Sequence, residues 1–175
     1  MMKIINMKRL VYDALLIALC TVLGYFSWDL RVFKLTFENL PVIIGAVLFG
    51  PLDGMLIGGI GTFLYQLLKY GLDATTVLWI IPYIVSGLFV GLMAKARQYE
   101  LKPWEMIVLL IVNGLLVTGL NTVGLIVAYK YVYRMPLETV LAAIPTRVLT
   151  SIVKSVVYAL IVPLLIKGLK TAKLL

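Results

Sequence analysis

Long apolar runs separated by short polar segments dominate the chain. The runs are continuous and do not alternate, which favours transmembrane helices over a β-barrel. By length and hydropathy we expect helical spans at residues 10–26, 40–49, 52–68, 75–93, 104–129 and 140–166. The pattern predicts an all-α protein, an integral membrane bundle of six transmembrane helices that forms a single domain over residues 1–175.

Gly50 and Pro51 interrupt the apolar sequence between the second and third spans. Proline lacks an N–H group and clashes with the preceding turn, so one helix should end near Gly50 and the next begin at once. Gly50, Gly54 and Gly58 recur every four residues and should share a helix face that another helix can approach closely. The second span is too short to cross a core of about 30 Å, so we expect other helices to shield it.

Composition and charge agree with a membrane location. Of the 175 residues, 62% are hydrophobic and 14% are charged, whereas soluble domains average about 45–50% and about 25%. The net charge of +8 could indicate nucleic-acid binding, but nine basic residues lie on the side of the termini and five in the opposite loops. By the positive-inside rule this bias predicts cytoplasmic termini, and nucleic acid is not an expected partner.

A polar stripe runs along the sixth span. Arg147, Ser151, Lys154 and Tyr158 are spaced by four, three and four residues and therefore share one helix face. Charges inside a membrane are costly, which makes each of them a candidate functional residue. Arg147 could reach the interface from its place near the outer end, whereas Lys154 lies deeper and is expected to face the interior. Two cations on one apolar face suit an anionic ligand.

Polar and aromatic residues on other spans predict a cavity in the outer half of the bundle. Asn121 and Thr122 interrupt the fifth span, Trp79 and Tyr83 lie on the fourth, and Gln66 lies on the third. Taken singly, the aromatic residues could anchor the interface or fill the core, and Asn121 could bond two helices. Taken together, they predict a site for a flat, charged small molecule.

The first polar loop, residues 27–39, is expected to lie over this cavity, and it contributes Trp28 and Arg31 as candidate substrate-binding residues. We assign Glu38 to this loop and not to the membrane. The carboxylates that adjoin the spans are then Asp13, Asp53, Glu105 and Glu138. The cations of the sixth span have no acidic partner in that span, so a bound carboxylate would offset the cost of burying them.

Motifs for catalysis, cofactors or metals do not occur in the sequence. It has no histidine, no HExxH motif, no phosphate-binding loop and no Cys-rich site, and its lone Cys20 lies in an apolar run. We therefore expect neither an enzyme nor a cofactor or metal site. A chain without an ATP site cannot drive primary transport by itself.

Two motifs carry a resemblance that covers essentially the whole chain: Ala14-Leu-Leu-Ile-Ala18, and Phe37-Glu-Asn-Leu-Pro41 followed by Phe49-Gly-Pro-x-x-Gly54-x-x-x-Gly58. With six short spans, they make the chain similar to the substrate-binding S component of energy-coupling factor (ECF) vitamin transporters. The resemblance implies a multi-pass protein of a bacterial cell membrane that captures a vitamin from outside. It further implies docking of Ala14 and Ala18 on a transmembrane coupling subunit, with energy supplied by two ATPase subunits.

Leu120-Asn-Thr122, Pro145-x-Arg147 and Lys154 look like the folate-type branch of that family. The chain departs from the branch at Thr62, where an acidic residue is expected, and at Thr75-Thr-Val-Leu-Trp79. Folate is therefore the first candidate ligand, and the alternatives are riboflavin, pyridoxine or a thiamine precursor. In a further alternative, the chain is a membrane assembly protein without a ligand. That alternative predicts that apolar residues can replace Arg147 and Lys154 without effect on ligand binding.

Overall fold

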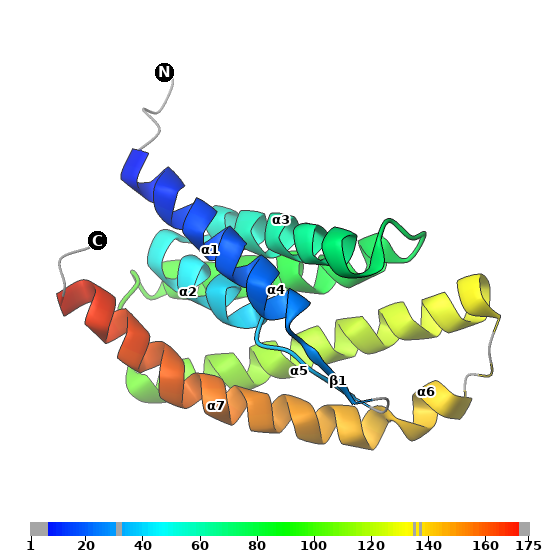
Figure 1. The fold of residues 1–175 in the computed structure, drawn as a ribbon. Helices are drawn as coiled ribbons and strands as arrows, with labels where there is room; N and C mark the ends of the chain where they lie inside the picture. The colour runs from blue at the N-terminus through cyan, green and yellow to red at the C-terminus, as the bar shows by residue number, and fades with distance from the viewer. Residues whose placement is uncertain (1–6, 31–32, 135, 137, 172–175) are drawn as a thin grey trace.

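Five long helices and one shorter helix alternate in direction and form the body of the protein, and the first of them begins at the same end of the bundle at which the last one ends (Figure 1). The computed structural model describes residues 7–30, 33–134, 136 and 138–171, with the backbone alone at 28–30, 33–35 and 170–171. Its elements are α1 (Met7–Tyr25), β1 (Trp28–Leu30), β2 (Phe33–Leu35), α2 (Asn39–Phe49), α3 (Pro51–Tyr70), α4 (Thr76–Ala96), α5 (Pro103–Val127), η1 (Ala128–Tyr133), α6 (Glu138–Ala142) and α7 (Ile144–Thr171).

The predicted spans all fall on helices, and the differences lie at the end of the bundle away from the termini. The first loop forms a small antiparallel hairpin in which Trp28 of β1 pairs with Leu35 of β2, so the all-α body carries one two-stranded addition. The π-helix η1 extends α5 to Tyr133, through residues predicted to be a loop. The sixth span is divided into α6 and α7 because Pro145 cannot donate a helical hydrogen bond and is best accommodated in the first turn of a new helix.

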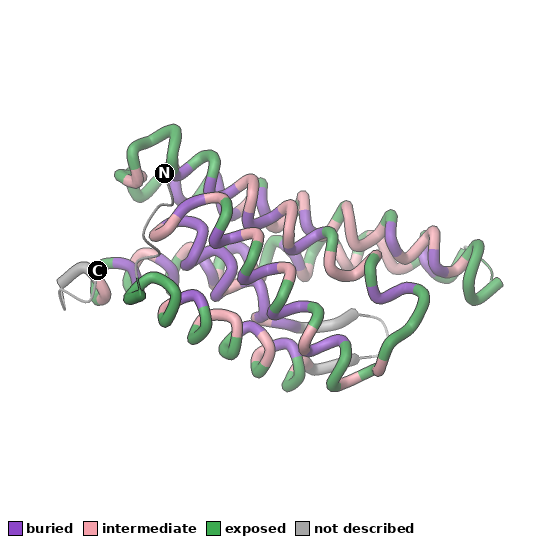
Figure 2. Tube along the Cα trace, turned by 90° about the horizontal axis from the view of Figure 1, so that it is seen from above, coloured by how far each residue is buried: buried purple, intermediate pink, exposed green. Residues whose placement is uncertain are grey.

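The short helix α2 lies at the centre of the bundle, as predicted from its length. It packs against α1, α3, α4 and α7, and eight of its eleven residues are buried. Ile43, Ala46 and Val47 of α2 join α4, α5 and α7 in one apolar core. Figure 2 shows buried positions along the inner faces of the helices and exposed positions around the outside.

The predicted glycine face brings α3 and α4 together backbone to backbone. A Cβ atom added to Gly58 would lie 2.5 Å from the carbonyl oxygen of Tyr83, and one added to Gly54 would lie 2.8 Å from that of Gly87. These distances are too short for any side chain, so the prediction of close helix contact is confirmed for both glycines. Gly50 does not belong to this face: it forms the turn between α2 and α3 with a φ of 107°, a conformation that favours glycine.

Three of the described helical segments are long and apolar enough to cross a membrane, judged by length and composition: Thr76–Ala96, Pro103–Tyr133 and Ile144–Leu169. The helix α2 is apolar but shorter. Many large apolar side chains are exposed on the outside of the bundle, among them Leu15, Leu68, Leu160 and Leu164. Such a surface suits lipid contact, and the number of membrane crossings stays a prediction.

Candidate substrate-binding site

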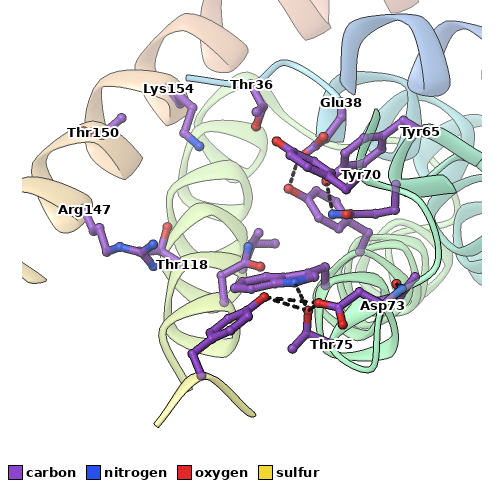
Figure 3. Close-up of a pocket in the computed structure, with 17 residues that line it drawn as sticks. Thr36, Glu38, Tyr65, Tyr70, Asp73, Thr75, Thr118, Arg147, Thr150 and Lys154 are labelled. Atoms are coloured by element: carbon purple, nitrogen blue, oxygen red, sulfur yellow. Dashed lines mark hydrogen bonds between the residues drawn. The ribbon is translucent and has the colours of Figure 1, made fainter. Parts of the chain in front are cut away.

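A cavity of about 350 Å³ lies toward the end of the bundle where α3 ends and α7 begins. Residues of α7 form one side of the cavity, residues of α3 and α4 form the other, and α5 and η1 lie between them (Figure 3). The volume falls in the range of about 300–1,000 Å³ that is usual for small-molecule sites. Polar and aromatic side chains predominate in its lining.

The α7 side is cationic. Arg147, Thr150 and Lys154 line the cavity from successive turns of α7, and both cations are half-buried. The Nη1 atom of Arg147 lies 3.5 Å from the Thr122 hydroxyl oxygen, a weak contact, and its buried Nε has no hydrogen-bond partner among the described residues. The structure thus brings the two predicted cations into one cavity. Thr122 of α5 contacts Arg147 but does not line the cavity.

Ser151 and Tyr158, the other members of the predicted stripe, lie deeper between α5 and α7. They line a small adjoining pocket of about 20 Å³ that also touches Lys154. Ser151 is buried at a close helix contact, where a Cβ added to Gly114 would lie 3.2 Å from its hydroxyl oxygen. The Tyr158 hydroxyl donates a long bond of 3.4 Å to the carbonyl oxygen of Thr36. The shared stripe is therefore confirmed, but only its outer half borders the main cavity.

The opposite side holds the predicted residues of α3 and α4. Trp79, Tyr83 and Gln66 all line the cavity. The Gln66 amide donates to the Tyr65 hydroxyl at 2.9 Å, and the Trp79 indole N–H donates to the Thr75 hydroxyl at 3.2 Å. These bonds orient the indole ring of Trp79 and the phenol ring of Tyr65 beside the cavity.

Glu38 is a cavity residue that was not among the predicted site residues, although its predicted place before the second span is confirmed. Its side chain is only 1% exposed and lines the cavity beside Tyr83, whose hydroxyl donates to one of its carboxylate oxygens. The other oxygen is buried against α1, where a Cβ added to Gly24 would lie 2.9 Å from it. The residue is buried because it directly precedes α2, which occupies the centre of the bundle. Its position next to an apolar run too short to span alone was the signal in the sequence.

A hydrogen-bond cluster joins the α3–α4 connection to η1 at the edge of the cavity. The Asp73 carboxylate accepts from the Thr75 hydroxyl at 2.9 Å, the Ala74 amide at 2.6 Å and the Tyr133 hydroxyl at 3.2 Å. The Thr75 hydroxyl and then the Ala74 amide are the main causes that hold the pKa of Asp73 below its usual value. The sequence analysis missed this cluster because Tyr133 was predicted to lie in a loop.

The remaining predicted residues are placed as follows. Asn121 of α5 lines the cavity. Only the backbone of Trp28 is described, and Arg31 lies outside the described residues. Ala14 and Ala18 are exposed on the outer face of α1 and do not belong to the cavity.

An apolar helix bundle with a polar, aromatic cavity near one end defines a membrane-embedded protein that binds a small molecule. The family described as "ECF transporter, substrate-specific component" matches residues 8–166, and the chain belongs to this family. No curated protein matches the chain. Its fold is similar to the crystal structure of the S component for biotin from an ECF-type ABC transporter, with a TM-score of 0.59 and 19% sequence identity over 91% of this chain and 93% of that chain. Identity at this level establishes the fold and leaves the ligand to be argued from the cavity.

Proposed function

We propose that this S component captures an anionic, ring-containing vitamin in the cavity between α3, α4 and α7, with folate as the first candidate. The observation that carries the proposal is the meeting of Arg147 and Lys154 with Trp79 and Tyr83 in one partly buried cavity. Cations suit a carboxylate, and aromatic faces suit a flat ring.

Arg147 is the stronger candidate for direct contact with the ligand. Its guanidinium group is half-buried and pairs with no carboxylate among the described residues. The planar, five-donor guanidinium binds a carboxylate through two parallel bonds, which a lysine ammonium cannot do. A ligand carboxylate would supply the partner that the protein does not.

Other vitamins remain alternatives. Biotin enters as a candidate because the S component of similar fold is one for biotin, and biotin also carries a carboxylate. Riboflavin, pyridoxine and a thiamine precursor lack this group and fit the cationic side less well. The ligand-free assembly protein is the alternative from another class, and it leaves the unpaired nitrogen of Arg147 without a function.

Delivery would depend on the outer face of α1. Ala14 and Ala18 lie on an exposed apolar stripe with Val11, Leu15 and Val22, at helical spacing. Small residues within an apolar stripe allow another helix to approach closely. We propose that this face docks on the transmembrane coupling subunit, that two ATPase subunits supply the energy, and that the chain crosses a bacterial cell membrane six times with cytoplasmic termini.

The test is ligand binding by purified protein. Native mass spectrometry should detect a co-purifying anionic vitamin, and calorimetry should show at least about tenfold weaker binding for Arg147→Ala, as expected for loss of a charge-assisted contact of about 1.5–3 kcal/mol. Arg134→Ala is the matched control, because Arg134 is exposed and lies outside the cavity. Unchanged affinity in Arg147→Ala and in Lys154→Ala would leave both cations structural and would refute the anionic ligand.

A further inference from the structure

The cavity has two charged sides, not one. Arg147 and Lys154 lie along α7, and Glu38 lies across the cavity beside the aromatic residues of α3 and α4 (Figure 3). The sequence places these groups more than a hundred residues apart, so only the fold brings them to one site.

Glu38 and Arg147 do not neutralise each other. Neither residue forms an ion pair within the described chain: Glu38 accepts from the Tyr83 hydroxyl, and Arg147 contacts the Thr122 hydroxyl. Buried charges are normally paired or fully hydrogen-bonded. Two groups of opposite charge that line one cavity without pairing with each other therefore suit a single molecule that reaches both.

We infer that the ligand is bipolar: an anionic group at Arg147 and Lys154, and a ring that donates N–H hydrogen bonds or carries positive charge at Glu38. This inference rests on the proposed function and narrows its substrate class. Gln66 and Asp73 add hydrogen-bond acceptors to the lining on the Glu38 side. Carboxylates there would repel a second anionic group, so the orientation of the ligand is fixed with its anion toward α7.

The first experiment compares ligands of different polarity by calorimetry on the purified parent protein. Biotin and folic acid carry a carboxylate and ring N–H donors, nicotinate carries a carboxylate without such donors, and riboflavin and thiamine lack a carboxylate. We expect biotin or folic acid to bind at least tenfold more tightly than the other three. Tighter binding by nicotinate would overturn the inference and leave the anionic ligand intact. Tighter binding by riboflavin or thiamine would overturn both, and no binding by any of the five would overturn the proposed function itself.

The second experiment uses variants with the tightest ligand of that set. Glu38→Gln keeps the shape of the side chain and an oxygen that accepts from Tyr83, and it should weaken binding at least tenfold. Glu138→Gln, at an exposed residue of α6 outside the cavity, is the matched control and should bind as the parent does. Thermal unfolding in detergent separates loss of binding from loss of fold.

The double variant Glu38→Gln/Arg147→Gln distinguishes a bipolar ligand from a pair of residues that serve each other. If one ligand contacts both groups, the two losses of affinity multiply, to about a hundredfold from two tenfold effects. Recovery of affinity in the double variant would show that the two charges balance each other in the protein, and it would overturn the inference. Equal affinity of Glu38→Gln and the parent would also overturn it.

Discussion

Replacement of Gly58 by alanine should loosen the contact between α3 and α4 and should disturb the cavity at the same time. The added Cβ would lie 2.5 Å from the carbonyl oxygen of Tyr83 and 2.8 Å from its carbonyl carbon. Ordinary contact needs about 0.9 Å more, and both neighbours are helix backbone, so the helices must separate. Tyr83 also donates to Glu38, which means that the displacement reaches the ligand site.

The expected magnitude is the difference between two opposing effects. Overpacking costs about 1–3 kcal/mol, whereas alanine stabilises a helix over glycine by about 0.5–1 kcal/mol. The central values leave a net loss of about 1.3 kcal/mol, which should lower the unfolding midpoint by about 2.5–5 °C for a chain of this size. Thermal unfolding of the detergent-purified protein measures it, and calorimetry on the same samples should show weaker ligand binding.

Gly119→Ala is the matched control with the opposite expected sign. Gly119 lies within α5, is exposed, and has open space where a Cβ would be placed. Alanine there gains helix stability without a clash, so the midpoint should stay equal or rise. A Gly58→Ala protein as stable as Gly119→Ala would show that the two helices do not meet as closely as the structure has them.

Three further predictions concern the docking face, the topology and the cavity edge. Ala18→Trp should leave ligand binding intact and abolish uptake in vesicles that contain the coupling and ATPase subunits; surviving uptake would exclude this face of α1. Cysteine at Ser27 should react with a membrane-impermeant reagent from outside and cysteine at Gln98 should not, with the buried Cys20 as an unreactive background; the reverse pattern would invert the topology. The pKa of Asp73 is lowered in the folded protein, so its carboxylate keeps its hydrogen bonds above the unfolded pKa of about 3.9 and loses them as the pH falls through the lower folded pKa. Ligand affinity should therefore be constant from pH 8 to pH 5 and fall only in stronger acid. A fall in affinity already at pH 6 would exclude Asp73 as the cause.

Sequence periodicity predicted the features that depend on a single helix. Gly54 and Gly58 share a face because they are four residues apart, and the close approach of α4 follows from their lack of side chains. Arg147 and Lys154 share a face of α7 for the same geometric reason. The burial of α2 followed from its length, since eleven residues cannot cross a membrane unaided.

Features that depend on two helices could not be derived in this way. Tyr133 reaches Asp73 only because α5 continues as a π-helix beyond the predicted end of the fifth span at residue 129, and hydropathy alone places a loop there. Ser151 shares the stripe of Arg147, but the close contact of α7 with Gly114 turns it into a packing residue of the helix interface. The spacing of residues along one helix predicts which of them share a face, but it does not predict which neighbouring helix packs against that face.

Glu38 shows why this difference matters for function. In the sequence, the cations of the last span have no acidic residue beside them in that span, and this pattern predicts an anion-binding site. In the fold, Glu38, which precedes α2, lines the same cavity, so the cavity has a cationic side and an acidic side. A simple anion would pair with the cationic side alone and leave Glu38 without an oppositely charged partner. The energetic reason is the one that makes Arg147 a candidate for ligand contact: a buried charge needs a partner. Applied to both sides of the cavity, that requirement selects a ligand with two different ends.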